Sequence, residues 1–376
     1  MDILVITWNF PPRRGGMEQL LASLCNGLSK NHRLFVITSY AGSSYERETG
    51  IFRPRWPGLF AFLSYALCKG ALLLRCQRDI SVVFGGSVLV TPLVLFLARI
   101  FRRKAIVQAH GLDVVYSRSI YQFLCVRWLK FCERVIANSG YTASLVEQKD
   151  VGPDRITVIP PGVDLEAFGR PVNAEAIKKE FGLEGKQIIL FVGRLARRKG
   201  VKGFIENSLP KIIRGLPDAC FVVVGDNPKQ SLAHRNDVLS EIKGAVAEMK
   251  MQDHVYLLGA LEDHDVIKLY HACEVVILPA VAVAGDVEGF GIVLLEAAAA
   301  GKPVVSTRIG GIAEAIEHKA SGILVEPEDY RSMSQSIIDL LSDHKVRSEI
   351  GEYAQKRVKE TFCWDLIIPR YEKAFL

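Results

Sequence analysis

Short apolar runs of three to six residues, rich in Val and Ile, alternate with longer helical patterns along the whole chain. Buried strands of parallel sheets have this composition, because helices cover both of their faces. The runs form two series: residues 3–8, 34–39, 81–84, 105–110, 135–138 and 157–159, and then residues 187–192, 220–224, 255–258, 275–278, 303–306 and 323–325. The sequence therefore predicts an α/β protein with two Rossmann-like, doubly wound domains.

The order of these patterns also predicts domain boundaries. Pro160-Pro161-Gly162 separates the two series of strands, so we expect one domain at residues 1–165 and a second at residues 166–361. The chain then continues into an apolar, aromatic tail. We expect this C-terminal helix, residues 362–376, to pack back on the first domain.

The composition is that of a globular enzyme and excludes a disordered or fibrous chain: 376 residues, 49% hydrophobic and 23% charged. The eight cysteines contain no C-x-x-C pair and fall mostly in apolar surroundings, which favours reduced core thiols over disulfides or zinc ligands. No basic, cleavable leader precedes the first expected strand. We therefore expect a cytoplasmic protein.

Two common nucleotide-binding signatures are missing from the sequence. No G-x-G-x-x-G follows the first expected strand of either domain, and no G-x-x-x-x-G-K-[ST] occurs anywhere. Ordinary dinucleotide-dependent dehydrogenases and P-loop ATPases are therefore disfavoured.

The segment from Glu288 to Gly301, E-G-F-G-I-V-L-L-E-A-A-A-A-G, places two carboxylates eight residues apart around the start of an apolar helix. Its Gly-Phe-Gly opening allows close backbone approach, and the first N–H groups of a helix attract phosphate. Eight residues are a little over two helical turns, so Glu296 can face the same cleft that Glu288 overlooks from the preceding loop. One glutamate could bind a ribose and the other a sugar, whereas the alternative is a buried packing helix.

Polar residues follow strands in both halves, where open α/β sheets bind their ligands. Gly15 and Gly16 end a loop after the first expected strand, and His110 with Asp113 follows the fourth. The structural alternatives are a plain turn and a capping or core pair. The loop at 193–200, G-R-L-A-R-R-K-G, holds four cations in six residues, which suits a diphosphate; the alternative is a solvated basic loop.

Together these segments resemble glycosyltransferase family 4, the retaining nucleotide-sugar enzymes of GT-B fold. The matching segments run in order over nearly the whole chain: G-G at 15–16, H-G-L-D at 110–113, N-S at 138–139, P-P-G-V-D at 160–164, G-R-L-A-R-R-K-G at 193–200, V-V-G-D at 223–226 and E-G-F-G-I-V-L-L-E at 288–296. The resemblance implies a GT-B fold, with an N-terminal acceptor domain and a C-terminal donor domain that face each other across a cleft.

The resemblance also implies roles for single residues. Arg194 and Lys199 would hold the donor diphosphate, Glu296 would bind the nucleotide ribose, and Glu288 would contact the transferred sugar near its anomeric carbon. His110 would lie beside that sugar, and Asp113 would orient the local loop or the acceptor. The expected donor-binding residues are Gly15, Gly16, Arg194, Lys199, Gly291, Ile292, Val293, Leu294 and Glu296, and the expected catalytic residues are His110, Asp113, Arg194, Lys199 and Glu288.

Members of this family usually act without a metal, and the resemblance implies no cofactor besides the nucleotide-sugar substrate. The chain has a D-x-D, Asp263-His264-Asp265, which is the metal motif of a differently folded glycosyltransferase class. It precedes a helical pattern at 266–273, so we expect Asp263 to cap a helix instead. Retention of configuration can follow a double displacement with two carboxylates or a front-face path through an oxocarbenium-like state, and the resemblance implies the front-face path.

Two segments have sequences most similar to those of the GDP-mannose-dependent mannosyltransferases of the family. They are N-F-P-P-R-R-G-G at 9–16 and G-D-V-E-G-F-G-I-V at 285–293. We therefore expect a hexosyltransferase that moves mannose from GDP-mannose to a lipid-linked or saccharide acceptor, in glycolipid or cell-surface polysaccharide synthesis. A UDP-sugar donor is the alternative within the family.

The N-terminal part of the chain is basic, since residues 1–105 hold 14 Lys/Arg against 5 Asp/Glu. Apolar runs at 59–76 and 88–101 lie in it, followed by Arg102-Arg103-Lys104. Both runs are shorter than the roughly 20 residues that span a bilayer. We expect interfacial helices that hold the protein on the anionic inner face of the cytoplasmic membrane, and buried helices are the alternative.

Other classes fit the sequence less well. A nucleotide-sugar epimerase could use the same architecture, and so could a sugar phosphorylase, although the latter needs a pyridoxal-phosphate lysine and a much longer chain. A basic protein that binds nucleic acid through Arg197, Arg198 and residues 99–104 is the non-catalytic alternative. Aromatic residues do not interleave with these clusters as stacking platforms do, so we expect no nucleic-acid partner.

Overall fold

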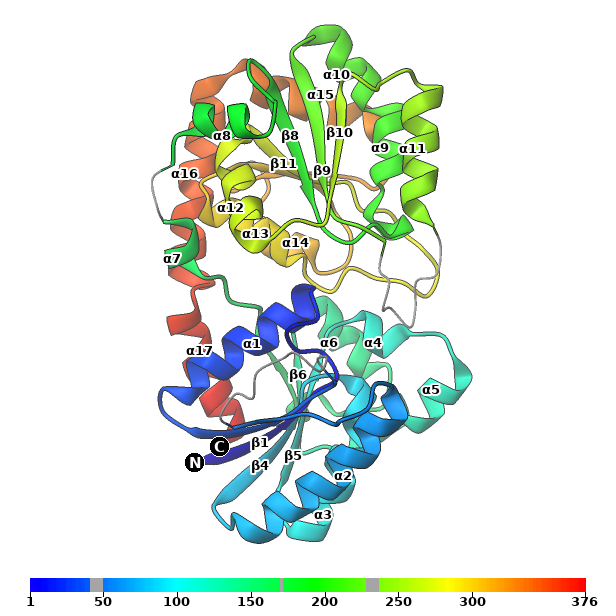
Figure 1. Cartoon of the computed structure of the whole chain (residues 1–376), viewed down its shortest axis with the longest axis vertical. Coiled ribbons are helices and arrows are strands. Elements are labelled where there is room, and N and C mark those ends of the chain that lie inside the picture. Colours follow the sequence, from blue (N-terminus) through cyan, green and yellow to red (C-terminus); the bar gives the residue numbers. More distant parts are fainter. Residues whose placement is uncertain (41–49, 170–171, 228–236) are drawn as a thin grey trace. The chain divides into compact units, whose positions relative to one another are not determined.

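The computed structural model describes residues 1–40, 50–169, 172–227 and 237–376. The chain forms two compact units, Met1–Gly162 with Trp364–Leu376, and Val163–Cys363. Each unit is built on a parallel sheet with helices around it, as the alternation of apolar runs and helical patterns predicts (Figure 1).

The first unit has a seven-stranded sheet with the order β3-β2-β1-β4-β5-β6-β7. Its strands are β1 Asp2–Ile6, β2 Arg33–Ile37, β3 Ile51–Phe52, β4 Ile80–Gly85, β5 Lys104–Ala109, β6 Arg134–Ala137 and β7 Ile156–Val158. Its helices are α1 Gly16–Ser29, α2 Leu59–Cys76, η1 Val88–Val90, α3 Thr91–Phe101, α4 Leu112–Val115, α5 Ser119–Leu124, η2 Val126–Phe131, α6 Gly140–Glu147, η3 Pro153–Arg155 and α17 Trp364–Phe375. The predicted strands of this half match within two residues at each end, except β3, which was missed.

The second unit has a six-stranded sheet with the order β10-β9-β8-β11-β12-β13. Its strands are β8 Gln187–Val192, β9 Ala219–Val224, β10 Val255–Gly259, β11 Val275–Leu278, β12 Val304–Thr307 and β13 Ile323–Val325. Its helices are α7 Leu165–Phe168, α8 Ala174–Glu180, η4 Arg197–Lys199, α9 Val201–Asn207, α10 Leu209–Gly215, α11 Val238–Glu248, α12 Asp263–Ala272, α13 Ile292–Ala299, α14 Ile312–Ala315, α15 Tyr330–Ser342 and α16 His344–Thr361. All six predicted strands of this half are present.

The C-terminal helix α17 is part of the first unit, where it packs on α1. Tyr371 is fully buried and donates its hydroxyl to Gln108 Oε1 of β5 at 3.0 Å, and the rings of Phe375 and Phe84 lie 5.3 Å apart. Gly162 lies directly against the indole of Trp364, where a Cβ would have no room. The apolar tail therefore completes the core of the first unit.

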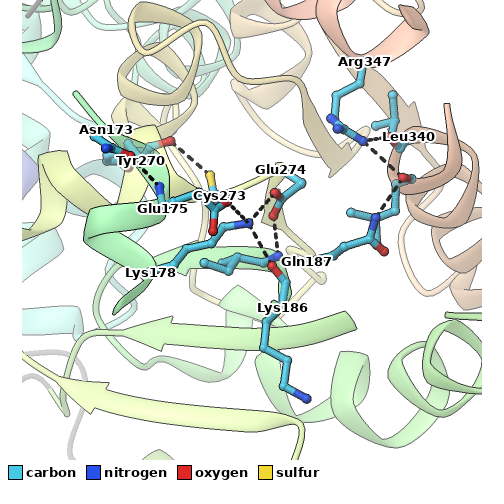
Figure 2. A network of polar contacts seen from close by, with 12 residues as sticks. Asn173, Glu175, Lys178, Lys186, Gln187, Tyr270, Cys273, Glu274, Leu340 and Arg347 are labelled. Atoms are coloured by element: carbon cyan, nitrogen blue, oxygen red, sulfur yellow. Dashed lines mark hydrogen bonds and ion pairs between the residues drawn. The ribbon is translucent and has the colours of Figure 1, made fainter. Parts of the chain in front are cut away.

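A network of hydrogen bonds and an ion pair lies at the amino ends of the strands of the second unit (Figure 2). Lys178 of α8 donates to Glu274 Oε1 at 2.8 Å and to the carbonyl of Lys186 at 2.8 Å, and Glu274 also accepts the Ile188 N–H. Gln187, at the start of β8, donates to the carbonyl of Leu341 at 3.1 Å. Ligands of such sheets bind at the opposite, carboxyl ends, so this network is structural.

All eight cysteines are free thiols, and five of them are buried. Burial raises the pKa of the Cys220 and Cys273 thiols to about 12. These cysteines are unreactive core residues.

Candidate active site

The strand order reverses at one point in each sheet, between β1 and β4 in the first unit and between β8 and β11 in the second. The crevice outside the carboxyl ends of strands at such a switch point is where doubly wound sheets bind ligands. In the second unit, the basic loop 193–200 follows β8 and the loop 279–291 follows β11. Three of the predicted donor-binding residues, Arg194, Lys199 and Gly291, lie in these loops, and four more lie in helix α13 directly after the second loop.

The two loops are held tightly together. The Val281 N–H donates to the Arg198 carbonyl at 2.8 Å. Gly200 has a φ of 70°, and a Cβ at this position would collide with the Pro279 carbonyl. Only glycine fits both the left-handed backbone and the close approach. The backbone therefore fixes the basic turn η4 against the start of the loop that carries Glu288.

Buried charges meet between these loops. Lys199 Nζ lies 2.8 Å from Glu288 Oε2, and Arg198 Nη1 lies 2.9 Å from the same oxygen. Arg198 Nε also lies 2.8 Å from Asp286 Oδ1. The four side chains are only 8 to 11% exposed, so each charge depends on its partners rather than on water.

The cluster keeps Glu288 ionised. Burial alone would raise the pKa of Glu288, but the charges of Lys199 and Arg198 outweigh it and hold this pKa at about 2. Burial lowers the pKa of Lys199, and Glu288 opposes that effect. An ionised carboxylate with little exposure to water accepts strong hydrogen bonds from hydroxyl groups.

The basic loop is neutralised largely by the protein itself. Arg197 is exposed and lies 2.6 Å from Glu241, and Arg198 and Lys199 are paired with Asp286 and Glu288. Carboxylates of the chain thus neutralise these three cations in part, which the sequence did not predict. Arg194 is half-buried and makes no ion pair with the described residues, so it is the cation of this loop without a carboxylate partner there.

Helix α13 begins at the end of the same loop. Gly291 precedes it with a φ of 85°, and the Leu294 N–H donates to the Gly291 carbonyl at 2.9 Å. The Leu294 N–H, which was predicted to bind the donor, is thus already hydrogen-bonded within the helix. The N–H groups of Ile292 and Val293 belong to the first turn, where a helix offers no acceptor of its own. The helix start can therefore offer two N–H groups to an anion.

Glu296 lies in α13 and accepts a hydrogen bond from the hydroxyl of Tyr270 at 2.8 Å. Tyr270 belongs to α12, is fully buried, and also donates to the Val293 carbonyl at 3.3 Å. Burial raises the pKa of Glu296, although the Tyr270 hydrogen bond opposes the shift. Hydroxyl groups of a ligand would stabilise the ionised form further.

The predicted residues of the first unit also lie at carboxyl ends of strands. Gly15 and Gly16 stand at the start of α1, and Glu18 in its first turn accepts from Asn9 Nδ2 at 2.7 Å. His110 follows β5 and is buried, with Nε2 2.9 Å from the carbonyl of Gly86 after β4.

Asp113 holds the loop around His110. Its carboxylate accepts the backbone N–H of His110 at 2.8 Å and that of Val88 at 3.1 Å. The carboxylate thus joins the ends of β4 and β5. These contacts fit the loop-orienting role that the resemblance implies.

Several buried polar atoms at this end of the first sheet have no hydrogen-bond partner among the described residues. They are Glu18 Oε2, Thr38 Oγ1, Ser39 Oγ, Ser87 Oγ and Asn138 Oδ1. Such atoms are costly unless a ligand or water satisfies them. Because all but one follow strands β2, β4 and β6, they mark the ligand-binding edge of this sheet.

The D-x-D segment has a structural role. Helix α12 begins at Asp263, and Glu262 is its N-cap residue, so the expectation that Asp263 caps the helix was wrong. Asp265 pairs with Lys268 at 3.2 Å. Within the described ranges, no three His, Cys, Asp or Glu side chains are grouped as a metal site requires.

Three residues of the second-unit site were not predicted: Arg198, Asp286 and Tyr270. Arg198 occurs in the 193–200 segment and Asp286 in the 285–293 segment, so each lies within two residues of a predicted site residue, Lys199 or Glu288. Tyr270 lies outside every motif. Its link to Glu296 depends on the packing of α12 against the sheet and has no signal in the sequence.

Two family models match the chain in order, glycosyltransferase family 4 at residues 14–167 and glycosyl transferases group 1 at residues 173–357. The chain belongs to the family 4 glycosyltransferases. An uncharacterized glycosyltransferase of Methanocaldococcus jannaschii is 28% identical, over 98% of this chain and 96% of its own. The GDP-mannose-dependent alpha-(1-6)-phosphatidylinositol monomannoside mannosyltransferase of Mycolicibacterium smegmatis is 26% identical, over 96% of this chain and 95% of its own. The recognition of this family from the motifs is thereby confirmed.

Solved structures of glycosyltransferases share the fold of this family 4 chain. HepE of Anabaena, solved in complex with UDP and glucose, is 20% identical and aligns with a TM-score of 0.80 over 99% of this chain and 98% of its own. The sucrose-phosphate synthase of Thermosynechococcus elongatus also gives a TM-score of 0.80, at 21% identity over 100% of this chain and 98% of its own. The GT-B class, with two Rossmann-like domains, is therefore confirmed.

Proposed function

We propose that this glycosyltransferase moves mannose from GDP-mannose to a lipid-linked or saccharide acceptor, with retention of anomeric configuration and without a metal. Glycolipid or cell-surface polysaccharide synthesis would be the setting. The observation that carries the proposal is the buried cluster of Lys199, Arg198 and Glu288, with Arg194 beside it. It combines fixed cations with an ionised carboxylate, as departure of a nucleoside diphosphate from a sugar requires.

The cations suit the leaving group. Negative charge develops on the diphosphate oxygens as the bond to the sugar breaks, and preorganised cations lower that barrier. Arg194 is available for two-point contact, and Lys199 has three N–H donors of which Glu288 occupies one. The N–H groups of Ile292 and Val293 would add the start of a helix to the same phosphates.

The two glutamates suit the ends of the donor. Glu288, ionised and next to the cations, would accept hydrogen bonds from sugar hydroxyls near the anomeric carbon. Glu296 would accept hydrogen bonds from both hydroxyls of the ribose. These hydrogen bonds would oppose the effect of burial, which raises the pKa of Glu296. Front-face attack by the acceptor, with its proton passing to the departing diphosphate, is consistent with retention.

The choice of GDP-mannose draws on relatives. Two that align over most of the chain are named as GDP-mannose-dependent mannosyltransferases, from Mycolicibacterium smegmatis and Corynebacterium glutamicum. A UDP-sugar is the second candidate, because HepE was solved with UDP-glucose. The base-binding residues that would discriminate between the two donors are not among the motif residues.

The unpaired polar atoms of the first unit support a polyhydroxylated acceptor. Glu18 Oε2 and Asn138 Oδ1 can only accept hydrogen bonds, whereas Ser87 Oγ can donate or accept. Hydroxyl groups of a sugar or inositol ring can do both. The acceptor would therefore present several hydroxyls to this edge of the sheet.

Release of GDP or UDP from a panel of nucleotide sugars tests the function, with a chelator present and with or without a membrane lipid extract. We expect GDP release from GDP-mannose that lipid extract stimulates and the chelator leaves unchanged. Release of UDP instead would favour the second donor, and loss of activity with chelator would overturn the metal-free reaction. No release from any donor and no binding of free GDP or UDP would refute the proposal.

A further inference from the structure

Helix α2 has an apolar side that none of the described residues of its unit covers. It is the one helix in the described part of the chain long and apolar enough to cross a membrane, with a mean hydropathy of 1.5, yet only 28% of it is buried. Phe60 is 85% exposed, Trp56 just before the helix is 73% exposed, and Leu67, Cys68 and Leu72 are also exposed. A core helix of this composition would be mostly buried.

The other side of α2 is committed to the fold. Phe62, Ala66, Gly70, Leu73 and Leu74 are buried. A Cβ on Gly70 would stand 2.8 Å from Leu97 of α3 and within 4 Å of Leu4 and Ile37 of the sheet. A spanning helix meets lipid all round, so α2 can present only one side to a membrane and would lie along its surface.

The exposed apolar side chains continue from α2 over its neighbours. Helix α2 packs on α3, α3 packs on η2, and η2 packs on α5. Figure 1 shows α2 and α3 on one side of the first sheet and α1 with α17 on the other. We name the exposed apolar residues of these elements the outer face: Trp56, Phe60, Leu67, Leu72, Phe96, Ile100, Ile120, Phe123, Leu124 and Phe131.

The segment that carries the outer face is rich in positive charge. Residues 55–131 contain eleven Lys/Arg and two Asp/Glu, and one of these acids, Asp113, is bound to backbone N–H groups. Arginines cover two of its aromatic rings: Arg127 lies 4.6 Å from the ring centre of Phe123, and Arg99 lies 5.4 Å from that of Phe131. Aromatic residues with cations beside them are typical of membrane interfaces.

We propose that the outer face docks on an anionic lipid bilayer, with Trp56 and the phenylalanines in the headgroup region and the arginines on lipid phosphates. Charge decides between this partner and a second copy of the chain. A symmetric dimer through this face would bring like charges together, whereas an anionic leaflet complements them. The face involves none of the donor-site residues, so the inference stands apart from the proposed function.

Co-sedimentation of the full chain with vesicles tests the docking, without donor or acceptor. Vesicles of phosphatidylcholine with phosphatidylglycerol are compared with vesicles of phosphatidylcholine alone. We expect the wild type to sediment with the anionic vesicles and at least tenfold less with the neutral ones. Both the F60S/F96S/F123S variant and the R75Q/R99Q/R127Q variant should lose at least tenfold in partition to the anionic vesicles.

Matched controls separate the outer face from general apolarity and charge. Val346 and Leu366 are exposed apolar residues elsewhere, so V346S/L366S should sediment like the wild type. Lys211, Lys243 and Lys356 are exposed cations of the other unit, so K211Q/K243Q/K356Q should do the same. Equal binding to both vesicles, a wild type that stays in the supernatant, or a dimer that the phenylalanine variant dissociates would overturn the inference. Unchanged thermal unfolding of the variants confirms that they fold.

Discussion

Lys199 and Glu288 form a buried ion pair, with Nζ 2.8 Å from Oε2, although they belong to two separate loops of the second unit. The pair brings together a cation predicted to hold phosphate and a carboxylate predicted to hold sugar. Arg198 contacts the same carboxylate oxygen and ties it to Asp286. Carboxylates of the protein thus neutralise two cations of the candidate donor site, Arg198 and Lys199.

Replacing either partner should impair transfer. We expect Lys199→Ala and Glu288→Ala each to lose at least tenfold in kcat/KM, or about 1.4 kcal/mol of barrier. Lys199→Ala should stay folded, because Arg198 still pairs with Glu288. Arg197→Ala is the control, since this cation of the same turn is exposed and bound to Glu241. Near-normal rates in both variants would contradict the assignment of the site.

Glu288 should make stability depend on pH. Its pKa is held at about 2 instead of the ordinary 4.5, so the folded state gains stability from the carboxylate above pH 4.5 and loses it as the pH falls toward 2. Denaturant unfolding of the wild type and Glu288→Gln measures the effect. The wild-type advantage should be on the order of 3 kcal/mol at pH 6 and shrink steadily below pH 4.5. An advantage independent of pH would show that Glu288 is not held ionised by its neighbours.

The sequence predicted the sheets well because period and composition are local properties. Twelve of the strands come from apolar runs, and the motif loops follow them as expected. Strand β3 was missed because two residues, Ile51 and Phe52, are too few to show a pattern. The N-cap of α12 was misplaced because Glu262, Asp263 and Asp265 are close together, and the sequence does not decide which of them precedes the first turn.

The candidate site was predictable where a motif contains the residue, and not where packing brings it in. Arg194, Lys199 and Glu288 were predicted from their motifs, and the structure places Lys199 beside Glu288. The sequence did not predict that Glu288 would neutralise Lys199, because that pairing depends on the two loops meeting after β8 and β11. Tyr270 reaches Glu296 from a different helix, so only the fold places it there.

Removing the Tyr270 hydroxyl should weaken donor binding. Glu296 would lose the hydrogen bond that opposes its desolvation, and its pKa would rise further. We expect Tyr270→Phe to raise the KM for the nucleotide sugar about three- to tenfold, with kcat changed less, because the ribose contact forms before the reaction. Tyr353→Phe is the control, since this exposed tyrosine makes the same kind of bond to Glu317 at 3.0 Å. An unchanged KM would contradict the proposal that Glu296 binds the nucleotide sugar.

Gly200 provides a test of how closely the two loops of the site must approach. We expect Gly200→Ala to lower the free energy of unfolding by more than the about 1 to 2 kcal/mol of a left-handed backbone, because its Cβ also collides with the Pro279 carbonyl. The loops must then separate, which moves Lys199 and lowers transfer as well. Gly182→Ala isolates the backbone contribution, since Gly182 has a φ of 67° and no atom within 4 Å of an added Cβ. Thermal unfolding, denaturant unfolding and donor turnover are measured for both variants. If both variants lose the same stability and both turn over the donor normally, the contact between Gly200 and Pro279 does not position the site.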